Sequence, residues 1–373
     1  MVLLIGNYPA DQQQSMQRFG KMMLQGLTAA GVEAELIQPE PFFGRIKLVG
    51  AFVSKWLAYI DKFLLFPRNL RRKLSTTVEI VHICDHSNAV YTKRFGETPV
   101  LITCHDLLAV RGALGEETDC PATFTGKFFQ RWILDGLKKA TAIACVSRAT
   151  LRDAERLVVR NHVHPQLHVV PNGLNYPYQK QPPETVRERL SGILNLERPF
   201  VLHVGSNLRR KNRAGLLRSF GLTKNDWNGQ LVLAGDPLSD ELRSLGEDLG
   251  ILDRIVEITN PDSMLLEALY SSAVALVYPS RFEGFGWPII EAQACGCPVI
   301  CSNREPLPEV AGDAALFRDI EDEAGFASDI LRLLDSAEHQ RWGEKSLRNA
   351  EKFSAEKMIA RYIDLYREIG AEV

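Results

Sequence analysis

The sequence predicts an α/β protein with two Rossmann-like, doubly wound domains that face each other across a cleft. Apolar runs typical of strands alternate with helical stretches, and such βαβ units form parallel sheets covered by helices. The alternation starts afresh after a polar stretch at 179–197 that contains Pro182 and Pro183, which we interpret as the linker. The chain has 373 residues, enough for two domains of roughly 150 residues each.

In the first half, a helix is predicted over 15–30, ending at Gly31, and Ser147 is expected to cap a helix that begins at Arg148. The strands predicted there are 2–6, 32–38, 78–84, 100–105, 141–147 and 168–171. The strands predicted in the second half are 200–204, 230–234, 254–259, 273–278 and 298–302. The expected domains are therefore 1–180 and 198–352, with a final helical segment at 353–373.

The composition is typical of a globular protein, with 45% apolar and 24% charged residues. The net charge of −2 gives no indication of nucleic-acid binding. The seven cysteines are odd in number and lie mostly in apolar runs, which indicates buried thiols in a reducing cytoplasm; Cys295 and Cys297 lack the second pair that a zinc site needs. Without a signal peptide or a run of roughly 18 apolar residues, we expect a cytoplasmic protein.

The segment 279–299, PSRFEGFGWPIIEAQACGCPV, is the most informative part of the chain. Glu283 lies in a glycine-flanked loop and Glu291 in a helix that begins near Pro288 and ends at Gly296. The unpaired N–H groups at the start of such a helix favour an anion such as a diphosphate. The residues expected to lie closest to it are Gly284, Phe285, Gly286 and Trp287. The alternative is an ordinary turn followed by an exposed helical glutamate.

This segment resembles the signature of the large retaining nucleotide-sugar glycosyltransferase family that includes bacterial mannosyltransferases, glycogen synthase-like enzymes and sucrose synthase, which have the GT-B fold. The resemblance continues through CSNREPLPEVAGDAALF to Phe317. It implies that Glu291 binds the donor ribose and that Glu283 lies beside the transferred sugar as a catalytic residue. It also implies that 353–373 returns to the first domain.

A second anion site is predicted in HVGSNLRRKNRAGLL, where a strand leads through a basic loop into a helix. Arg210 and Lys211 could neutralise a leaving diphosphate, although most basic clusters are simply solvated. The resemblance matches Lys211 to a diphosphate-binding lysine. It places Ser206 where many relatives have an arginine, so that Arg209 or Arg210 would take over that role, and Gly235 near the base.

In the first domain, the resemblance matches His105 to a histidine near the transferred sugar, with Asp106 beside it. Relatives have a glycine pair in the first loop, whereas here Gln14 and Ser15 could donate hydrogen bonds to a phosphate or to the acceptor. His82, Asp85 and His86 are either acceptor contacts or residues of the fold.

The segment 42–74 is basic and aromatic, with eight Lys and Arg, a single acid (Asp61) and Trp56 among its aromatic residues. Such a helix pair could lie on the anionic inner face of a membrane and receive a lipid-linked acceptor. The alternative is a helix that packs on the sheet and exposes a solvated basic face. Both interpretations stay open from the sequence.

The predicted function is retaining transfer of a hexose, of mannose or glucose type, from a GDP- or UDP-linked sugar to a saccharide or lipid-linked saccharide. No cofactor is expected beyond this nucleotide-sugar substrate, and no metal, because the chain lacks an Asp-x-Asp motif. Two alternatives are a nucleotide-sugar epimerase of the same architecture and a non-catalytic sugar-nucleotide sensor.

Overall fold

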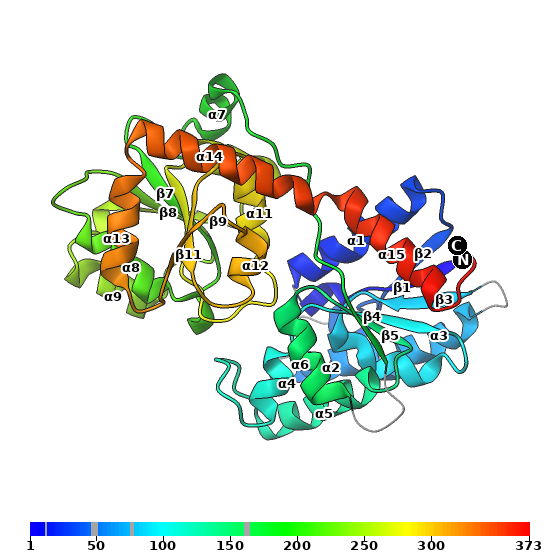
Figure 1. Cartoon of the computed structure of the whole chain (residues 1–373). Helices are drawn as coiled ribbons and strands as arrows, with labels where there is room; N and C mark the ends of the chain where they lie inside the picture. The colour runs from blue at the N-terminus through cyan, green and yellow to red at the C-terminus, as the bar shows by residue number, and fades with distance from the viewer. Residues whose placement is uncertain (12, 46–50, 75–77, 160–164) are drawn as a thin grey trace. The chain divides into compact units, whose positions relative to one another are not determined.

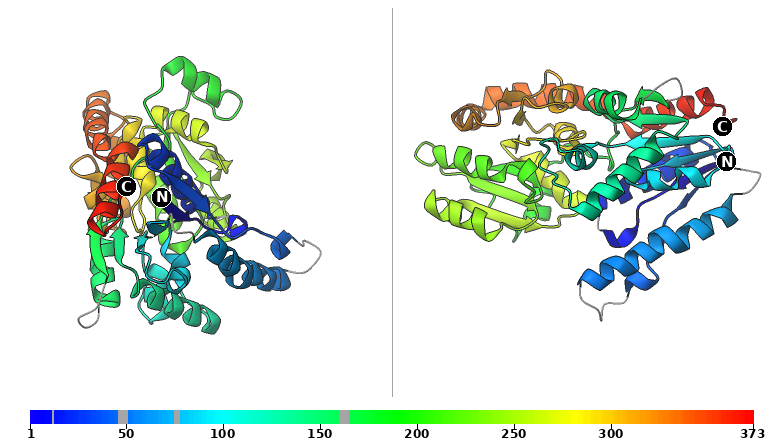
Figure 2. Two further views of the ribbon diagram at one scale, coloured as in Figure 1. Left: turned by 90° about the vertical axis from the view of Figure 1, so that its right-hand side faces the viewer. Right: turned by 90° about the horizontal axis from the view of Figure 1, so that it is seen from below.

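The computed structural model describes residues 1–11, 13–45, 51–74, 78–159 and 165–373. The chain forms two compact units, one of 1–175 with 355–373 and the other of 176–354. Each unit contains a six-stranded sheet, and Figures 1 and 2 show helices on both faces of each sheet. This confirms the predicted α/β class with two parallel sheets.

The first sheet is entirely parallel and has the order β2-β1-β3-β4-β5-β6. Its strands are β1 (Val2–Ile5), β2 (Ala34–Ile37), β3 (Ile80–Ile83), β4 (Val100–Cys104), β5 (Ala142–Cys145) and β6 (Gln166–Val169). All six predicted strands are therefore confirmed. The chain order reverses at β1, which has β2 on one side and β3 on the other, so the topological switch point lies between β1 and β3.

Alternate residues of these strands face two helical layers. Leu3, Val81 and Ile102 belong to a core with residues of α3, α5 and α6, whereas His82 and Thr103 contact α15 on the opposite face. The helices and helical turns of this unit are η1 (Pro9–Asp11), α1 (Gln14–Ala29), η2 (Phe43–Arg45), α2 (Ala51–Ile60), η3 (Asp61–Leu65), α3 (Phe66–Lys73), η4 (His86–Arg94), α4 (Leu108–Ala113), α5 (Phe124–Leu137), α6 (Arg148–Val158) and α15 (Ala355–Glu368). The Ser147 cap is confirmed, because its Oγ accepts a hydrogen bond from the amide of Thr150 at 3.1 Å.

The C-terminal helix α15 is held in the first unit by a buried chain of hydrogen bonds. His82 contacts the hydroxyl of Tyr366 through Nδ1 at 2.7 Å and the hydroxyl of Thr103 through Nε2 at 2.8 Å. The Thr103 hydroxyl also contacts the hydroxyl of Tyr362 at 2.8 Å. Burial lowers the pKa of His82 to about 3, so its imidazole is neutral near pH 7.

A π-helical turn, η3, anchors the start of the basic aromatic segment. The carboxylate of Asp61, 1% exposed, accepts hydrogen bonds from the backbone amides of Phe42, Phe43 and Gly44 at 3.1, 3.0 and 2.9 Å. It also accepts one from the hydroxyl of Tyr8 at 2.8 Å. The single acid of this segment is therefore a structural anchor that joins residues 42–44 to the loop after β1.

The second sheet is also parallel and has the order β12-β11-β10-β7-β8-β9. Its strands are β7 (Phe200–Gly205), β8 (Gln230–Gly235), β9 (Ile255–Thr259), β10 (Ala275–Tyr278), β11 (Val299–Ser302) and β12 (Leu316–Arg318). The five predicted strands are confirmed, and β12 is an addition that the sequence analysis missed. The switch point of this sheet lies between β7 and β10.

The predicted linker at 179–197 is wrong, because this segment lies inside the second unit and forms α7 (Pro183–Leu190). The amides of Gln179 and Gln181 donate to side chains of α10 (Ser263–Ser272), at 3.1 and 3.0 Å. The other helices of this unit are η5 (Arg209–Lys211), α8 (Arg213–Leu222), α9 (Asp240–Asp248), η6 (Leu252–Arg254), α11 (Trp287–Ala294), α12 (Leu307–Ala311), α13 (Glu323–Arg332), α14 (Ser336–Ala350) and η7 (Glu351–Phe353).

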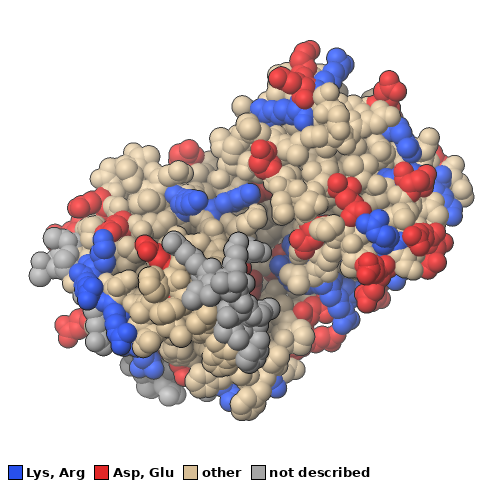
Figure 3. Space-filling view, turned by 180° about the vertical axis from the view of Figure 1, so that it is seen from behind, with Lys and Arg blue, Asp and Glu red and all other residues tan. Residues whose placement is uncertain are grey.

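All seven cysteines are free thiols, and all except Cys120 are buried. Within the described part of the chain, no helix is both long and apolar enough to cross a bilayer. On the face drawn in Figure 3, basic and acidic side chains are interspersed.

Candidate functional site

The candidate site lies at the switch point of the second sheet, where β7 and β10 are neighbours. Lys211 follows β7 in the short turn η5, and Glu283 follows β10 in the glycine-flanked loop. Because both strands are parallel and end at the same edge of the sheet, these two loops meet. Ligands of doubly wound sheets bind at such an edge.

The side chains of these loops form a compact charged network. Lys211 Nζ donates hydrogen bonds to Glu283 Oε1 at 2.5 Å and to the hydroxyl of Tyr278 at 2.7 Å. Arg210 Nη1 donates to Glu283 Oε2 at 3.0 Å, and the Tyr278 hydroxyl donates to Glu283 Oε1 at 2.8 Å. The side chains of Glu283 and Lys211 are only 8% and 11% exposed, so their charges are screened little by solvent.

This network holds Glu283 in its ionised form. Burial alone would raise the pKa of Glu283, but the positive charges of Lys211 and Arg210 outweigh burial and lower the pKa to about 2. Burial lowers the pKa of Lys211, whereas the charge of Glu283 raises it and so limits the shift. The site thus combines two cations and one carboxylate in a poorly solvated place.

The two arginines that the sequence left as alternatives differ in their positions. Arg210 reaches the network, and its carbonyl also accepts a hydrogen bond from the amide of Arg281 at 2.7 Å. Arg209 is exposed at the surface of the same turn. Of the two, Arg210 is therefore the side chain that lies with Lys211 and Glu283.

Arg213, which the sequence analysis missed, joins the loops after β7 and β8. Its guanidinium donates to the carbonyl oxygens of Gly205 and Asp236, at 2.6 and 2.8 Å, and to Asn207 Oδ1 at 2.5 Å. The predicted residue Ser206 lies in the first of these loops. Gly235 has a φ of 132°, and a Cβ there would lie 2.2 Å from the carbonyl oxygen of Gly205, so only glycine fits this approach of the two strands.

His203 is a second residue that sequence reasoning missed. It lies fully buried in β7, its Nδ1 contacts the carbonyl of Val277 at 3.0 Å, and its ring stacks on that of Tyr278 with a centroid distance of 6.2 Å. Burial and the charge of Arg213 lower the pKa of His203 to about 3. The neutral imidazole of His203 thus packs against Tyr278, whose hydroxyl contacts both Lys211 and Glu283.

Glu291 lies in the helix α11 of the signature segment and contacts a different element. Its side chain accepts a hydrogen bond from the hydroxyl of Tyr270 in α10 at 2.9 Å, and the residue is 4% exposed. The alternative of an exposed helical glutamate is therefore wrong.

The loop before this helix contains the other predicted residues of the signature segment. Gly286 has a φ of 106°, and Phe285 and Gly286 are buried, whereas Gly284 and Trp287 are partly exposed.

The predicted residues of the first unit lie near the carboxyl edge of its sheet. His105 is buried after β4, and its Nε2 contacts the carbonyl of Cys84 at 3.0 Å. Burial lowers the pKa of His105, although the charge of Asp85 opposes this shift. Asp106 caps the following turn by accepting a hydrogen bond from the amide of Leu108 at 3.0 Å.

The switch point of the first sheet holds a polar cluster around Asp85. Asn7 Nδ2, from the loop after β1, donates to Asp85 Oδ2 at 2.5 Å, and His86 Nδ1 lies 3.1 Å from Asp85 Oδ1. Gln13 contacts Asn7 at 2.6 Å, whereas the predicted Gln14 and Ser15 are exposed at the start of α1. From the described residues of this loop, Asn7 therefore contacts Asp85 directly and Gln13 joins the cluster through Asn7.

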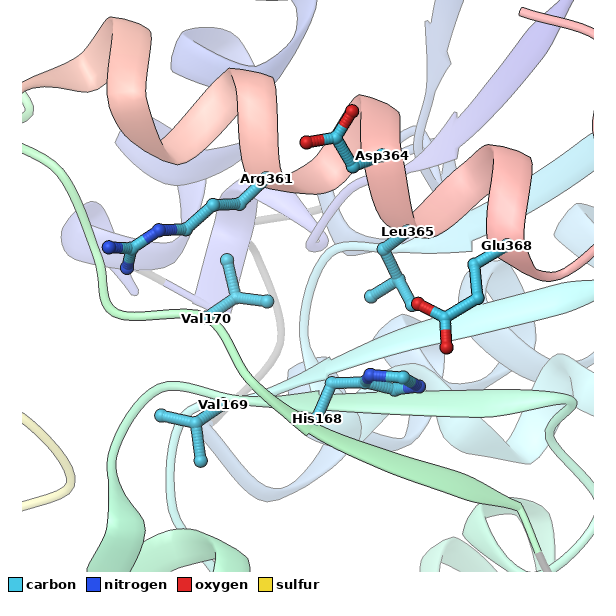
Figure 4. Close-up of a pocket in the computed structure, with 7 residues that line it drawn as sticks. All are labelled: His168, Val169, Val170, Arg361, Asp364, Leu365 and Glu368. Carbon is cyan, nitrogen blue, oxygen red and sulfur yellow. The ribbon is translucent and has the colours of Figure 1, made fainter.

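A pocket of about 210 Å³ lies between β6 and α15 in the first unit. Figure 4 shows the carboxylate of Glu368 above the ring of His168, with Arg361 at the other end of the pocket. The pocket contains none of the predicted site residues. We therefore do not assign it to the site.

The basic aromatic segment packs on α5 through aromatic rings. Phe63 stacks on Phe129 with a centroid distance of 5.5 Å, and Tyr59 lies 5.1 Å from the same ring. Beside these partly buried rings, the side chains of Trp56 and Leu64 are 52% and 50% exposed. Lys47 and the side chains of Arg45, Lys55 and Arg71 lie outside the described residues.

Two family models match adjacent parts of the chain. Residues 16–176 match "Glycosyltransferase Family 4" and residues 187–348 match "Glycosyl transferases group 1". O-antigen chain mannosyltransferase B of Escherichia coli is 35% identical over 179 residues, which cover 45% of each chain. N-acetyl-alpha-D-glucosaminyl L-malate synthase of Bacillus anthracis is 26% identical over 240 residues, 63% of this chain and 61% of the relative. The aligned region thus spans about half to three-fifths of the length of these curated relatives.

Solved structures share the whole fold at low sequence identity. Sucrose-phosphate synthase from Thermosynechococcus elongatus has a TM-score of 0.78 and 21% identity, covering 99% of this chain and 98% of the other. WaaG, a glycosyltransferase involved in lipopolysaccharide biosynthesis, has a TM-score of 0.73 and 15% identity, covering 98% and 99%. Residues 187–348 therefore belong to the glycosyltransferase group 1 family, residues 16–176 match glycosyltransferase family 4, and the whole chain has the GT-B fold of these structures.

Proposed function

We propose that this protein is a retaining hexosyltransferase. It would take a mannose- or glucose-type sugar from a GDP- or UDP-linked donor and pass it to a saccharide or lipid-linked saccharide acceptor in bacterial cell-surface polysaccharide or glycolipid synthesis. The observation that supports this proposal most directly is the pair of cations, Arg210 and Lys211, which contact Glu283 at the switch point of the second sheet.

The chemistry of these groups fits a nucleoside diphosphate sugar. Arg210 and Lys211 would compensate the charge that develops on the diphosphate as the glycosidic bond breaks, in place of a metal ion. Glu283, which is ionised at neutral pH, would stabilise the positive charge that develops at the anomeric carbon. In front-face transfer the leaving phosphate helps to remove the acceptor proton, so no covalent sugar intermediate on Glu283 is required.

The names of similar proteins support the substrate classes. Two of the relatives are O-antigen chain mannosyltransferases, from Escherichia coli and Salmonella typhimurium. A structure with the same fold, Anabaena HepE, was solved in complex with UDP and glucose. These names support a nucleotide-sugar donor and a saccharide acceptor.

The first test is the thermal stability of the purified protein against GDP, UDP and their mannose and glucose conjugates. A ligand that binds only the folded state raises the midpoint, by an amount that grows with its concentration. We expect one base to give a shift that Glu291→Ala loses, because Glu291 is proposed to bind the ribose. Product analysis then separates transfer, which releases the nucleoside diphosphate, from epimerisation, which leaves an isomerised nucleotide sugar. No shift with any of these ligands would contradict the proposal.

We further propose that the basic aromatic segment contacts an anionic membrane. The exposed side chains of Phe124 and Phe128 on α5, at 90% and 64%, extend the exposed aromatic surface beyond residues 42–74. The exposed Arg68 and Arg72 on α3 supply positive charge. We expect sedimentation with phosphatidylglycerol vesicles but little with phosphatidylcholine vesicles. Binding that is unchanged when both arginines become Glu would contradict membrane contact.

A further inference from the structure

The cations proposed to bind the diphosphate already hold an anion. Both oxygens of the Glu283 carboxylate are engaged, Oε1 by Lys211 and Tyr278 and Oε2 by Arg210. Lys211, Tyr278 and Arg210 therefore form an anion-binding site, and the anion that they bind in this structure is a side chain of the protein itself. A buried carboxylate between two cations offsets charges that would otherwise be costly to bury together.

We infer that Glu283 is a resident counter-ion that an entering diphosphate must displace from Arg210 and Lys211. This inference rests on the proposed function and adds to it a second role for Glu283. Before donor binding, the carboxylate keeps the cations paired and in place. On binding, the diphosphate takes over both cations, and the released carboxylate becomes available to the sugar.

Displacement of the Glu283 carboxylate by a diphosphate has a measurable consequence. That consequence would be absent if Glu283 only contacted the transferred sugar. A residue that only contacts the sugar has no effect on ligands without a sugar. A resident counter-ion competes with every anion that uses the same cations, so its removal strengthens their binding. Inorganic pyrophosphate, GDP and UDP are therefore the informative probes, because they carry the diphosphate and lack the transferred hexose.

The experiment is titration calorimetry of these three probes against wild type, Glu283→Gln and Glu283→Asp at one ionic strength. Glutamine has the same shape without the charge, so we expect Glu283→Gln to bind pyrophosphate at least tenfold more tightly than wild type. Glu283→Asp keeps the charge on a shorter side chain and should lie between the two. Equal or weaker binding of pyrophosphate, GDP and UDP by folded Glu283→Gln would overturn the inference.

The matched control is Glu267→Gln in the same unit. Glu267 is also buried and forms an ion pair with Arg189 at 2.7 Å. It lies in α10, and its partner is not one of the cations proposed to bind the diphosphate. This variant should lose stability without any gain in pyrophosphate affinity, and a gain equal to that of Glu283→Gln would overturn the inference. Failure of the proposed function can be told apart from failure of this inference. If only the proposed function failed, nucleotide sugars would not raise the thermal midpoint of wild type, but Glu283→Gln would still bind pyrophosphate more tightly than wild type. Absence of pyrophosphate, GDP and UDP binding by every variant would also overturn the inference.

Discussion

At the switch point of the second sheet, the charge of each buried residue is compensated by an opposite charge on a neighbouring side chain. Glu283, Lys211 and Arg210 are each costly to bury alone, and their mutual contacts offset that cost. Tyr278, supported by His203, adds a neutral donor that satisfies the carboxylate further. At this scale, the removal of one charge is therefore expected to affect both stability and ligand binding.

Replacement of Glu283 by Gln should lower the free energy of unfolding of the second unit by about 3 kcal/mol at pH 7, because two buried cations lose their counter-charge. The pKa of Glu283 is lowered to about 2 from an ordinary value of 4.5. Its charge therefore contributes fully above about pH 4.5, and that contribution is lost as the pH falls towards 2. Urea unfolding of both proteins at pH 7, 5, 4 and 3 should show the difference shrinking only at the acidic end. A difference that stays constant down to pH 3 would contradict the network.

At the scale of elements, the turn η3 joins two parts of the first unit that are distant in sequence. Its Asp61 satisfies backbone amides of residues 42–44 and the hydroxyl of Tyr8 in the loop after β1. Lys62, the next residue, forms an ion pair with Asp11 of the same loop at 2.5 Å. π-helical turns are frequent at functional sites. Here the turn holds the start of the basic aromatic segment against a loop at the first switch point.

Replacement of Asp61 by Ala should therefore release residues 42–44. Three partly buried backbone donors and one buried hydroxyl lose their acceptor, which should cost about 3 kcal/mol. Hydrogen exchange of the amides of Phe42, Phe43 and Gly44 should accelerate at least a hundredfold, whereas those of β4 should change little. The control is Asp61→Asn, which keeps one acceptor oxygen and should give an intermediate effect. Unchanged exchange in Asp61→Ala would show that other contacts hold this segment.

At the scale of the whole molecule, each unit contains one fully buried, neutral histidine in its sheet, His82 in the first and His203 in the second. Both have a pKa of about 3, against 6.5 in the unfolded chain. The unfolded chain therefore binds protons that the folded chain does not, so stability falls as the pH decreases from 6.5 towards 3. Each histidine steepens this fall by about 1.4 kcal/mol per pH unit.

We expect His82→Gln to flatten the pH dependence of the first unit between pH 6.5 and 4. Hydrogen exchange of β3 amides at several pH values measures this unit separately from the other. His168→Gln is the control in the same unit, because His168 is only half-buried in the edge strand β6. The same slope in wild type and His82→Gln would contradict a neutral His82 in the folded state.

Most of the strand framework could be predicted because central strands of parallel sheets are continuous apolar runs. The strand β12 was missed because it has only three half-buried residues and ends in Arg318. The stretch 179–197 was misread as a linker because its polar residues and prolines dominate the pattern, although Val186 and Leu190 are buried.

Within the candidate site, the glutamate spacing and the basic loop identified Glu283, Lys211 and Arg210 from local sequence. Tyr278 and His203 lie within apolar strand sequences, and Arg213 closely follows three other basic residues, so local patterns gave no signal for them. The contact between His203 and Tyr278 arises from the pairing of β7 with β10, and the contact of Arg213 with the Asp236 carbonyl arises from the pairing of β7 with β8.

The return of α15 to the first sheet affects the order in which the chain can fold during synthesis. Residues 176–354 form a continuous unit that is complete as soon as residue 354 has left the ribosome. The first unit is made earlier but waits for residues 355–373, which supply Tyr362 and Tyr366 to His82 and Thr103. Until then, the part of the sheet around His82 and Thr103 lacks the helix that covers it. The half that is synthesised first is therefore expected to be the half that finishes folding last.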